Sequence, residues 1–390
     1  MGHAFFLAWQ YLRHHKVRSV ILAVSLGLLL ALPAALHRLL DEGERWMNAR
    51  AAATPLLVGA KGSSVDLVLK ALYFTDSAAA PITMAEADRI AATGWADPLP
   101  VYARFRVHGL PVVGVTLDYF DFRGLAAGRG VLPAMLGDCV LGADAANRLG
   151  LTPGDTLPTA PDNPFDLAGA YPLKLRVAGV LAKAGSPDDR AIFVDLQTAW
   201  VMEGLGHGHS ETAAPAARPD AAFGVLPQAV ETVTYTEITP DNLASFHFHG
   251  DPSTYPVSAV IAVNRDERSG TLLKGRYLAS NASAQIVRPL ETTRSLLENV
   301  FRLGQLFNAV LMAVGAATAM VVGLVFALSL RLRQREIETI HLLGCARWTV
   351  ARLILAEIAL VTAAAALVAW GTLEAVGSLA PEFIRRFVIA

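Results

Sequence analysis

A long apolar run without a single charge limits what this chain can fold into. Residues 307–330, FNAVLMAVGAATAMVVGLVFALSL, are numerous enough to cross a hydrocarbon core of roughly 30 Å as a helix. A second apolar run, 353–370, follows, and Arg331, Arg333 and Arg335 lie between the two. The pattern predicts two membrane-spanning helices joined by a short basic connector.

The connector has the charge of a cytoplasmic loop. Its arginines, with Arg347 and Arg352 at the far end, predict a cytoplasmic position by the positive-inside rule. Ile337, Ile340 and Leu343 recur three residues apart, so they share one side of a helix. The connector is therefore expected to contain a short amphipathic helix.

The bounds of this short helix follow from local chemistry. Glu336 suits the positive N-terminal end of a helix dipole, and Gly344 favours an end to the helix. A helix of this kind can dock into a groove on a cytoplasmic partner, or it can lie on lipid headgroups. The pattern alone gives the two interpretations about equal weight.

The N-terminus predicts a further span. Residues 3–16 form an amphipathic stretch suited to the inner membrane surface, and residues 19–36 are apolar. A cleaved signal peptide is the alternative, but the run is long and no small-x-small site closes it. The basic residues before the run predict an N-terminus inside and the chain after Leu40 outside.

The long stretch between the first and second spans has the composition of a globular domain. Strand-like runs occur at residues 55–59, 101–107, 111–117, 173–181, 191–194 and 257–263, and helical runs at 83–93, 144–149, 196–202 and 265–279. Residues 41–53 and 292–305 are predicted to extend the spans outward as stalk helices. The fold class is an α+β membrane protein: three transmembrane helices, with a large mixed α/β extracytoplasmic domain between the first and second. The predicted divisions are 1–53, 54–288 and 289–390.

Composition narrows the possible functions. Hydrophobic residues make up 53% and charged residues 17% of the chain, and the net charge of −1 implies no bulk attraction to nucleic acid. Of the two cysteines, Cys139 is predicted outside and Cys345 inside, so they cannot pair within one chain.

Several longer motifs resemble a known family. The run LRLRQREIETIHLLGCARWTVARLILAE resembles the cytoplasmic signature of the FtsX/MacB-type permeases of ABC transporters, with Glu336, Leu343, Gly344 and Glu357 in the family's places. The segments 141–157 and 175–196 resemble the periplasmic domain of MacB-type permeases. The family would add a fourth span, for which residues 371–390 are too polar. The resemblance implies a multi-pass protein of the bacterial inner membrane.

The family also implies roles and partners. By resemblance, residues 337–343 form the coupling helix, which with Glu336 and Gly344 meets an ABC ATPase subunit. Further expected partners are a second permease subunit in a homodimer or heterodimer, a candidate periplasmic binding or adaptor protein, and membrane lipid. The implied function is a permease subunit that couples ATP hydrolysis to movement of the extracytoplasmic domain, for export or mechanotransmission. The alternative is a non-transporting, FtsX-like relay that controls an extracytoplasmic enzyme.

The motifs of nucleotide and hydrolase sites do not occur in the sequence. GAKGSS at 59–64 lacks the P-loop spacing, so ATP is expected to bind the partner subunit. Neither H-E-x-x-H nor G-x-S-x-G occurs, and we expect no enzyme built on them. Asp188 and Asp189, in Ser-Pro-Asp-Asp, are interpreted as turn-forming residues, with a catalytic pair as the alternative.

Two further clusters are candidate sites. Gly315, Ala319 and Gly323 recur every four residues, a spacing that lets helices pack closely within the subunit or across a dimer. Histidines occur in two H-x-H pairs with carboxylates nearby, a set that could bind zinc: His207, His209, His247 and His249. The alternative is that these are loop histidines without a specific ligand.

Overall fold

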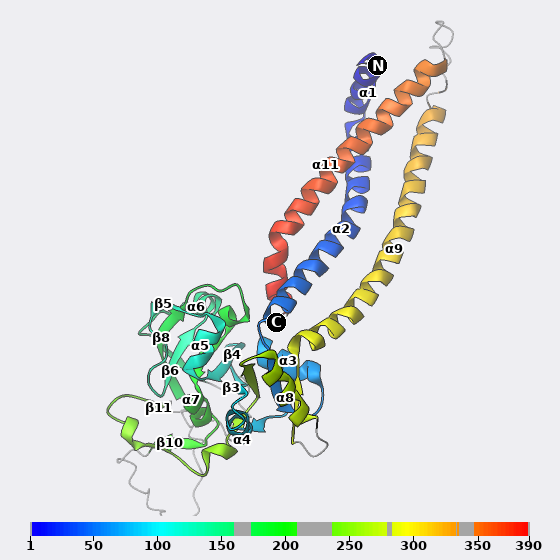
Figure 1. The fold of residues 1–390 in the computed structure, drawn as a ribbon. Coiled ribbons are helices and arrows are strands. Elements are labelled where there is room, and N and C mark those ends of the chain that lie inside the picture. The colour runs from blue at the N-terminus through cyan, green and yellow to red at the C-terminus, as the bar shows by residue number, and fades with distance from the viewer. Residues whose placement is uncertain are drawn as a thin grey trace, which may run out of the picture. The chain divides into compact units, whose positions relative to one another are not determined.

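The computed structural model describes residues 2–159, 173–208, 236–278, 283–332, 334 and 347–388. Its contacts divide the chain into two units (Figure 1). One unit comprises residues 1–47 and 295–388, and the other comprises residues 48–294. The coupling residues predicted between Glu336 and Gly344 lie outside the described residues.

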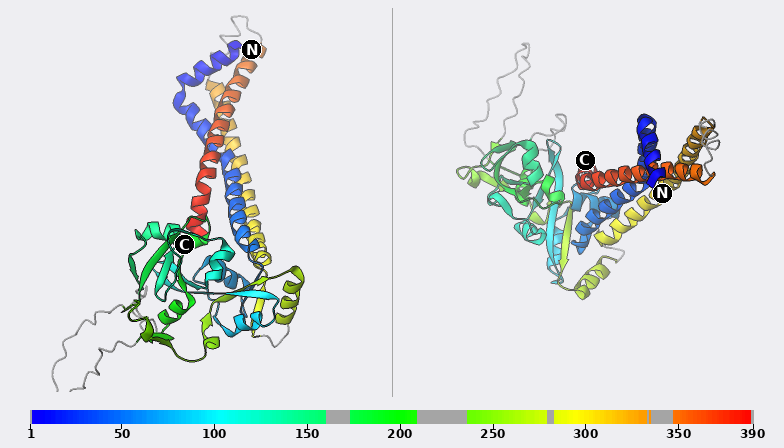
Figure 2. Two further views of the ribbon diagram at one scale, coloured as in Figure 1. Left: turned by 60° about the vertical axis from the view of Figure 1, so that its left-hand side comes forward. Right: turned by 90° about the horizontal axis from the view of Figure 1, so that it is seen from above.

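The first unit is helical. It contains α1 (Gly2–His14) and most of three long helices, α2 (Lys16–Ala52), α9 (Pro289–Leu332) and α11 (Arg347–Val388). Each long helix includes a stretch apolar and long enough to cross a membrane, within 16–52, 305–324 and 350–380. The long helices are continuous in both views of Figure 2.

Both segments predicted as stalks are helical and continuous with these long helices. The helix α2 continues past the predicted end of the apolar run to Ala52, although Pro33 lies inside it. The helix α9 begins at Pro289 and runs without interruption into its apolar stretch. Proline inside a helix removes one backbone donor, a loss that one turn of a long helix can absorb.

Close packing in the helical unit depends on Gly27. A Cβ at this position would lie 2.7 Å from the carbonyl oxygen of Ala365 and 2.7 Å from the Cβ of Val368 on α11. The two backbones can therefore approach each other here only because residue 27 is glycine. Many large apolar side chains of the unit remain exposed, among them Met320 at 77% and Leu324 at 69%. Such a surface is typical of helices that face lipid.

The second unit is built on a large mixed sheet. Its strand order is β11-β8-β6-β9-β4-β3-β14-β1-β15, and β5 and β7 also pair with β8. The pairs β4–β9, β6–β8 and β8–β11 are parallel, and the other pairs are antiparallel. The strands are β1 (Leu56–Ala60), β3 (Ala96–Val107), β4 (Leu110–Val115), β5 (Ala127–Gly130), β6 (Asp138–Leu141), β7 (Thr156–Pro158), β8 (Leu173–Leu181), β9 (Ile192–Asp195), β11 (Thr236–Glu237), β14 (Ala259–Asn264) and β15 (Ala284–Val287).

Short helices and two small ribbons complete this domain. The ribbons pair β2 (Ile82–Thr83) with β13 (Pro256–Val257), and β10 (Gly206–Gly208) with β12 (Phe246–Phe248). The helices are α3 (Ser64–Tyr73), α4 (Ala85–Ala91), α5 (Leu117–Arg123), α6 (Ala143–Leu149), α7 (Leu196–Met202) and α8 (Glu267–Tyr277), with 3-10 turns η1 (Pro187–Arg190), η2 (Leu243–Ser245) and η3 (Pro252–Thr254).

Local sequence explains where several of these helices begin. The side chains of Ser63, Asp195 and Asp266 accept hydrogen bonds from backbone N–H groups in the first turns of α3, α7 and α8. The helices α5 and α6 each end at a glycine with a left-handed backbone, Gly124 and Gly150. The prediction of a mixed α/β domain is confirmed, but helices α3 and α5 were not predicted.

An aromatic cluster packs around Phe193 in the interior of this domain. Phe193 of β9 packs against Tyr119 and Phe120 of α5, with ring centroids 5.7 and 5.5 Å apart, and against Phe74 at 6.1 Å. All four rings are buried. These contacts fix α5 on the sheet and thereby set the direction of the Tyr119 hydroxyl group.

Candidate functional site: a buried ion pair at the end of helix α2

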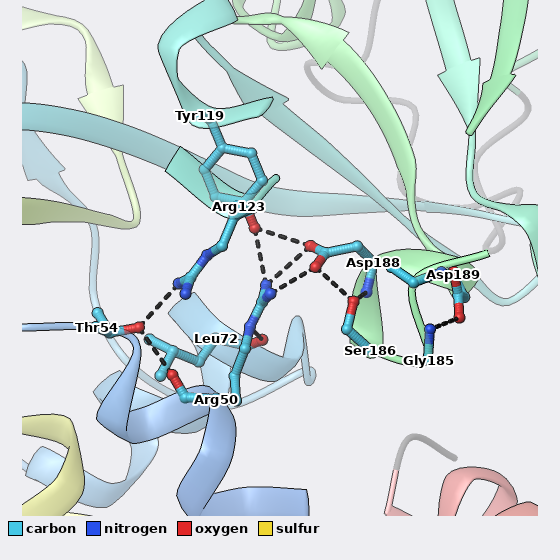
Figure 3. Close-up of polar contacts among 10 residues, drawn as sticks. Arg50, Thr54, Leu72, Tyr119, Arg123, Gly185, Ser186, Asp188 and Asp189 are labelled. Carbon is cyan, nitrogen blue, oxygen red and sulfur yellow. Dashed lines mark hydrogen bonds and ion pairs between the residues drawn. The ribbon is translucent and has the colours of Figure 1, made fainter. Parts of the chain in front are cut away.

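The last turn of α2 carries an arginine that is buried in the domain. Arg50 is 8% exposed, and its guanidinium group forms a two-point ion pair with the carboxylate of Asp188. Nη1 donates to Oδ2 and Nη2 donates to Oδ1 at 2.8 Å, while Nε donates to the carbonyl oxygen of Leu72 at 3.3 Å (Figure 3). The pair joins the end of α2 to a turn far along the chain.

The turn η1 holds the Asp188 carboxylate in place. The Ser186 hydroxyl donates to Oδ2 of Asp188 at 2.7 Å and accepts the backbone N–H of Asp188 at 3.3 Å. The neighbouring Asp189 accepts the backbone N–H groups of Ala184 and Gly185 at 2.8 and 2.7 Å. Asp189 is therefore the turn-forming residue that the Ser-Pro-Asp-Asp motif predicts, whereas Asp188 is the partner of Arg50.

A glycine allows this turn to lie against the start of α6. A Cβ at Gly142 would lie 2.2 Å from the carbonyl oxygen of Asp188 and 2.4 Å from that of Asp189. The backbone N–H of Gly142 also donates to the carbonyl oxygen of Ala191 at 2.9 Å. The two segments that resemble MacB-type periplasmic domains, 141–157 and 175–196, thus meet at the turn that carries Asp188.

Helix α5 supplies two further side chains to this cluster. The Tyr119 hydroxyl accepts a hydrogen bond from Nη2 of Arg50 and donates one to Oδ1 of Asp188, both at 2.9 Å. The guanidinium of Arg123 lies 5.7 Å from the Tyr119 ring centroid, and its Nη2 donates to Oγ1 of Thr54 at 2.9 Å. Thr54 in turn donates to the carbonyl oxygen of Arg50 at 3.0 Å, so both the side chain and the backbone of Arg50 are held.

The electrostatics favour a charged pair and a neutral phenol. Burial acts to raise the pKa of Asp188, but the Arg50 charge and its hydrogen bonds outweigh burial and hold that pKa below its usual range. Burial acts to lower the pKa of Arg50, and Tyr119 and Asp188 more than offset it. Burial raises the pKa of Tyr119 to about 12. At neutral pH the guanidinium and the carboxylate are both ionised, and the phenol can donate to Asp188.

The cluster is suited to anchoring rather than to catalysis. Asp188 is 1% exposed, and both of its oxygens are engaged by Arg50, Tyr119 and Ser186. A carboxylate so enclosed has no free path to a substrate, so the arrangement does not support the alternative of a catalytic aspartate pair. Removing one member of a buried ion pair leaves the other charge without compensation, which makes the contact costly to break.

The two stalk helices connect to neighbouring strands of the sheet. Strand β1 begins shortly after α2 ends, and β15 ends shortly before α9 begins. These two strands form an antiparallel pair with Leu57 opposite Val287 and Ala60 opposite Ala284. Arg50 fixes the end of α2, which leads into β1. The ion pair therefore holds the chain just before β1, and the pairing with β15 holds β1 itself.

The predicted helix-packing residues lie on α9. A Cβ at Gly315 would come 4.0 Å from Cδ2 of Leu29 on α2, and a Cβ at Gly323 would meet no atom within 4 Å. Ala319 and Gly323 border a groove that Leu26, Ile354 and Ile358 also line. The small residues of α9 are therefore not in tight helix contact within the described residues, and the choice between packing within a subunit and across a dimer stays a prediction.

Three of the four predicted metal-binding histidines come together on the small ribbon of β10 and β12. Nitrogen atoms of His207, His247 and His249 lie within 4.8 Å of one another. The fourth, His209, lies outside the described residues, as does Glu211. Two nearby carboxylates are engaged elsewhere: Glu203 accepts from Tyr102 at 2.8 Å, and Asp251 caps η3.

Sequence reasoning missed the partners of Asp188. Arg50 was assigned only to a stalk, and Tyr119 and Arg123 to no site. The sequence signals for this pair are weak: Arg50 is a basic residue at the end of a long predicted helix, and Asp188 lies in a turn motif. Nothing in one sequence connects the two, because their proximity depends on the folded sheet.

Comparison with known proteins identifies the domain. Residues 49–233 match the family of MacB-like periplasmic core domains. Two solved structures are similar to this chain: the periplasmic region of MacB from Actinobacillus actinomycetemcomitans, and the extracellular domain of the noncanonic ABC-type transporter YknZ from Gram-positive bacteria. The first has 13% identity and a TM-score of 0.34, covering 63% of this chain and 93% of that chain. The second has 11% identity and a TM-score of 0.32, covering 60% and 98%. No curated protein matches this chain.

The family match and the apolar helices together define a class of protein. A MacB-like periplasmic core domain and three helices suited to crossing a membrane are the parts of an ABC transporter membrane subunit. The match includes the segments 141–157 and 175–196, so their resemblance to the periplasmic domain of MacB-type permeases is confirmed.

Proposed function

We propose that this chain is the permease subunit of an ABC transporter complex in the bacterial inner membrane, and that a separate ATPase drives movements of its extracytoplasmic domain. No P-loop spacing occurs in the sequence, which supports placing the nucleotide on a separate ATPase subunit. The MacB-like domain and the three apolar helices support the permease assignment. We expect this movement to serve either the export of a cargo or mechanotransmission.

The observation that carries this proposal is the attachment of both stalk helices to one strand pair. The helix α2 leads into β1, and β15 leads into α9. The strands β1 and β15 are paired, from Leu57 opposite Val287 to Ala60 opposite Ala284. A displacement of either helix therefore acts directly on the sheet rather than on a loop. The register of strands with a buried face is strongly specified, so we expect β1 and β15 to move together.

The Arg50–Asp188 ion pair ties the last turn of α2 to the domain. Without it, the link between α2 and β1 would be a short segment free to rotate. With it, the last turn of α2 is fixed to η1 and, through Tyr119, to α5. A displacement of the last turn of α2 can thus be passed to η1 and α5 as well as to β1 and β15.

At the other end of the pathway, we assign the coupling role to residues 336–344. Ile337, Ile340 and Leu343 are the apolar face that would dock on the ATPase, and Glu336 and Gly344 mark the ends of the helix. Exposed apolar groups at helical spacing need a partner surface or lipid. The positive charge of the connector supports a cytoplasmic position for this helix. We include a second permease subunit in the proposed complex.

ATP hydrolysis in lipid nanodiscs tests this function. The chain and the ATPase that co-purifies with it would be compared as wild type, Ile340→Asp and Asp188→Asn. We expect Ile340→Asp to abolish co-purification or stimulated hydrolysis. We expect Asp188→Asn to retain the ATPase but to lose cargo movement in reconstituted vesicles.

Two outcomes contradict the proposal. Normal hydrolysis and normal cargo movement by Ile340→Asp would remove the coupling role of the connector. Absence of any ATPase partner would remove the transporter function itself. Normal ATPase coupling without export, together with activation of an extracytoplasmic hydrolase, would instead favour the non-transporting relay.

A further inference from the structure

Three imidazole rings come together at the ribbon of β10 and β12, two from its strands and one from the residue after β12. His207 lies directly opposite His247 in the antiparallel register, and His249 follows two residues after His247. The ring centroids are 5.0 Å apart for His207–His247, 4.9 Å for His207–His249 and 4.6 Å for His247–His249. Each ring therefore neighbours both others, as the ligands of a single ion must.

The sequence of the two strands explains this arrangement. The strand Gly206–Gly208 reads Gly-His-Gly, and the strand opposite reads Phe-His-Phe. Side chains alternate between the faces of a strand, so the two phenylalanines point away from the histidines. A Cβ at Gly206 would lie 2.8 Å from the Phe248 ring, and one at Gly208 would lie 2.7 Å from the Phe246 ring. The glycines thus make room for two rings that pack on the core, and the histidines are left on the other face.

Backbone contacts hold the ligands in position. Nδ1 of His247 lies 3.2 Å from the carbonyl oxygen of Ser245. A contact of a ring nitrogen with a backbone carbonyl orients the imidazole, and such a contact is usual beside metal-binding histidines. The segment at His249 is fixed as well, because its carbonyl oxygen accepts from the Tyr255 hydroxyl at 2.9 Å and its N–H donates to Leu205 at 3.4 Å.

The chemistry of this donor set favours a borderline transition metal over a hard cation. Within the described residues, the cluster contains three imidazoles and no carboxylate. Calcium and magnesium prefer oxygen ligands, whereas imidazole suits zinc and copper. Three protein ligands also leave one tetrahedral position for water or for a donor from outside.

We propose that His207, His247 and His249 form a binding site for a divalent transition metal ion, with Zn²⁺ as the probe ion. Zinc–nitrogen bonds of about 2.0–2.1 Å require nitrogen atoms about 3.4 Å apart in a tetrahedron. The nitrogens already lie within 4.8 Å, so small side-chain rotations of rings that are half-buried or exposed close the site. The bound ion would join β10, which follows α7, to β12.

Metal titration of the full chain tests this proposal. The protein would be purified in detergent through a tag without histidine, and Zn²⁺ affinity would be measured by competition with a chromophoric chelator. We expect one ion per chain with a dissociation constant below about 10 μM, equivalent to about −7 kcal/mol. His247→Ala and His207→Ala should each weaken binding at least about tenfold.

Matched controls separate this site from other histidines. His108 is exposed in a turn with a left-handed backbone that asparagine tolerates, so His108→Asn should not change the affinity. His14 and His15 also lie close together, with ring centroids 4.9 Å apart, and His14→Ala/His15→Ala should leave the high-affinity ion in place. In addition, Co²⁺ bound by wild type should give visible absorption bands that His247→Ala lacks.

The proposal fails under clear outcomes. A wild-type dissociation constant weaker than about 100 μM would overturn it, since that is about −5.5 kcal/mol. Unchanged affinity in His247→Ala and His207→Ala would also overturn it. So would loss of the ion in His14→Ala/His15→Ala with retention in His247→Ala. None of these outcomes depends on ATP hydrolysis, so the site and the proposed permease function are tested separately.

Discussion

Arg50 and Asp188 form a buried, two-point ion pair although 138 positions separate them in the chain. The pair connects the helix that contains the first apolar run to the turn between β8 and β9. Tyr119 bridges the two charged groups by accepting from one and donating to the other. This relationship ties the last turn of α2 to the domain built on the mixed sheet.

Loss of the Asp188 charge should strongly destabilise the domain. Asp188→Asn leaves the Arg50 charge buried without its counter-ion, so we expect a loss of about 3–5 kcal/mol in the free energy of unfolding. Denaturant-dependent proteolysis of the full chain in detergent measures this loss. The exposed Asp118 provides the control, since Asp118→Asn should change stability by about 0.5 kcal/mol or less. Equal stability of the two variants would contradict the anchoring role.

The same pair predicts how stability depends on pH. The pKa of Asp188 is lower in the folded protein than its ordinary value, so its contribution is fully present above about pH 4 and is lost as the pH falls through the folded value. The stability difference between wild type and Asp188→Asn should therefore narrow at acidic pH. Unfolding midpoints of both proteins at a series of pH values test this, and a constant difference down to about pH 2 would refute the assignment.

Gly142 should not tolerate a side chain. Gly142→Ala places a Cβ 2.2 Å from the Asp188 carbonyl oxygen, and because the obstacle is backbone, the turn η1 must move. We expect a loss of about 1–3 kcal/mol. Gly275→Ala is the matched control, because a Cβ there meets no atom within 4 Å and lies inside helix α8. That control should gain up to about 1 kcal/mol from helix propensity. A neutral Gly142→Ala would show that the turn is not held as described.

Labelling with a membrane-impermeant maleimide tests the predicted topology. The native Cys139 is unsuitable as an external reporter because it is fully buried and burial raises the pKa of its thiol. Leu278, which is 74% exposed, is a better position for an introduced cysteine. In spheroplasts Leu278→Cys should react at once, whereas Cys345 should react only after permeabilisation. The reverse order would invert the proposed orientation.

The sequence by itself determined the elements whose signals are local. The apolar runs, the strand at residues 173–181 and the helix at residues 196–202 agree with the structure, because each depends on side-chain periodicity and on caps within a few residues. The turn chemistry of Ser-Pro-Asp-Asp correctly predicted the role of Asp189. The helices α3 and α5 were missed because short helices packed on a sheet carry a weak periodic signal.

The tertiary structure decided which distant residues meet. The folded domain brings η1 into contact with the last turn of α2, so an arginine assigned only to a stalk and an aspartate assigned only to a turn become one buried pair. Likewise, the histidine motifs were visible in the sequence, but only the register of β10 and β12 sets His207 opposite His247. Such long-range pairings depend on the packing of the whole sheet, and no single segment of sequence encodes them.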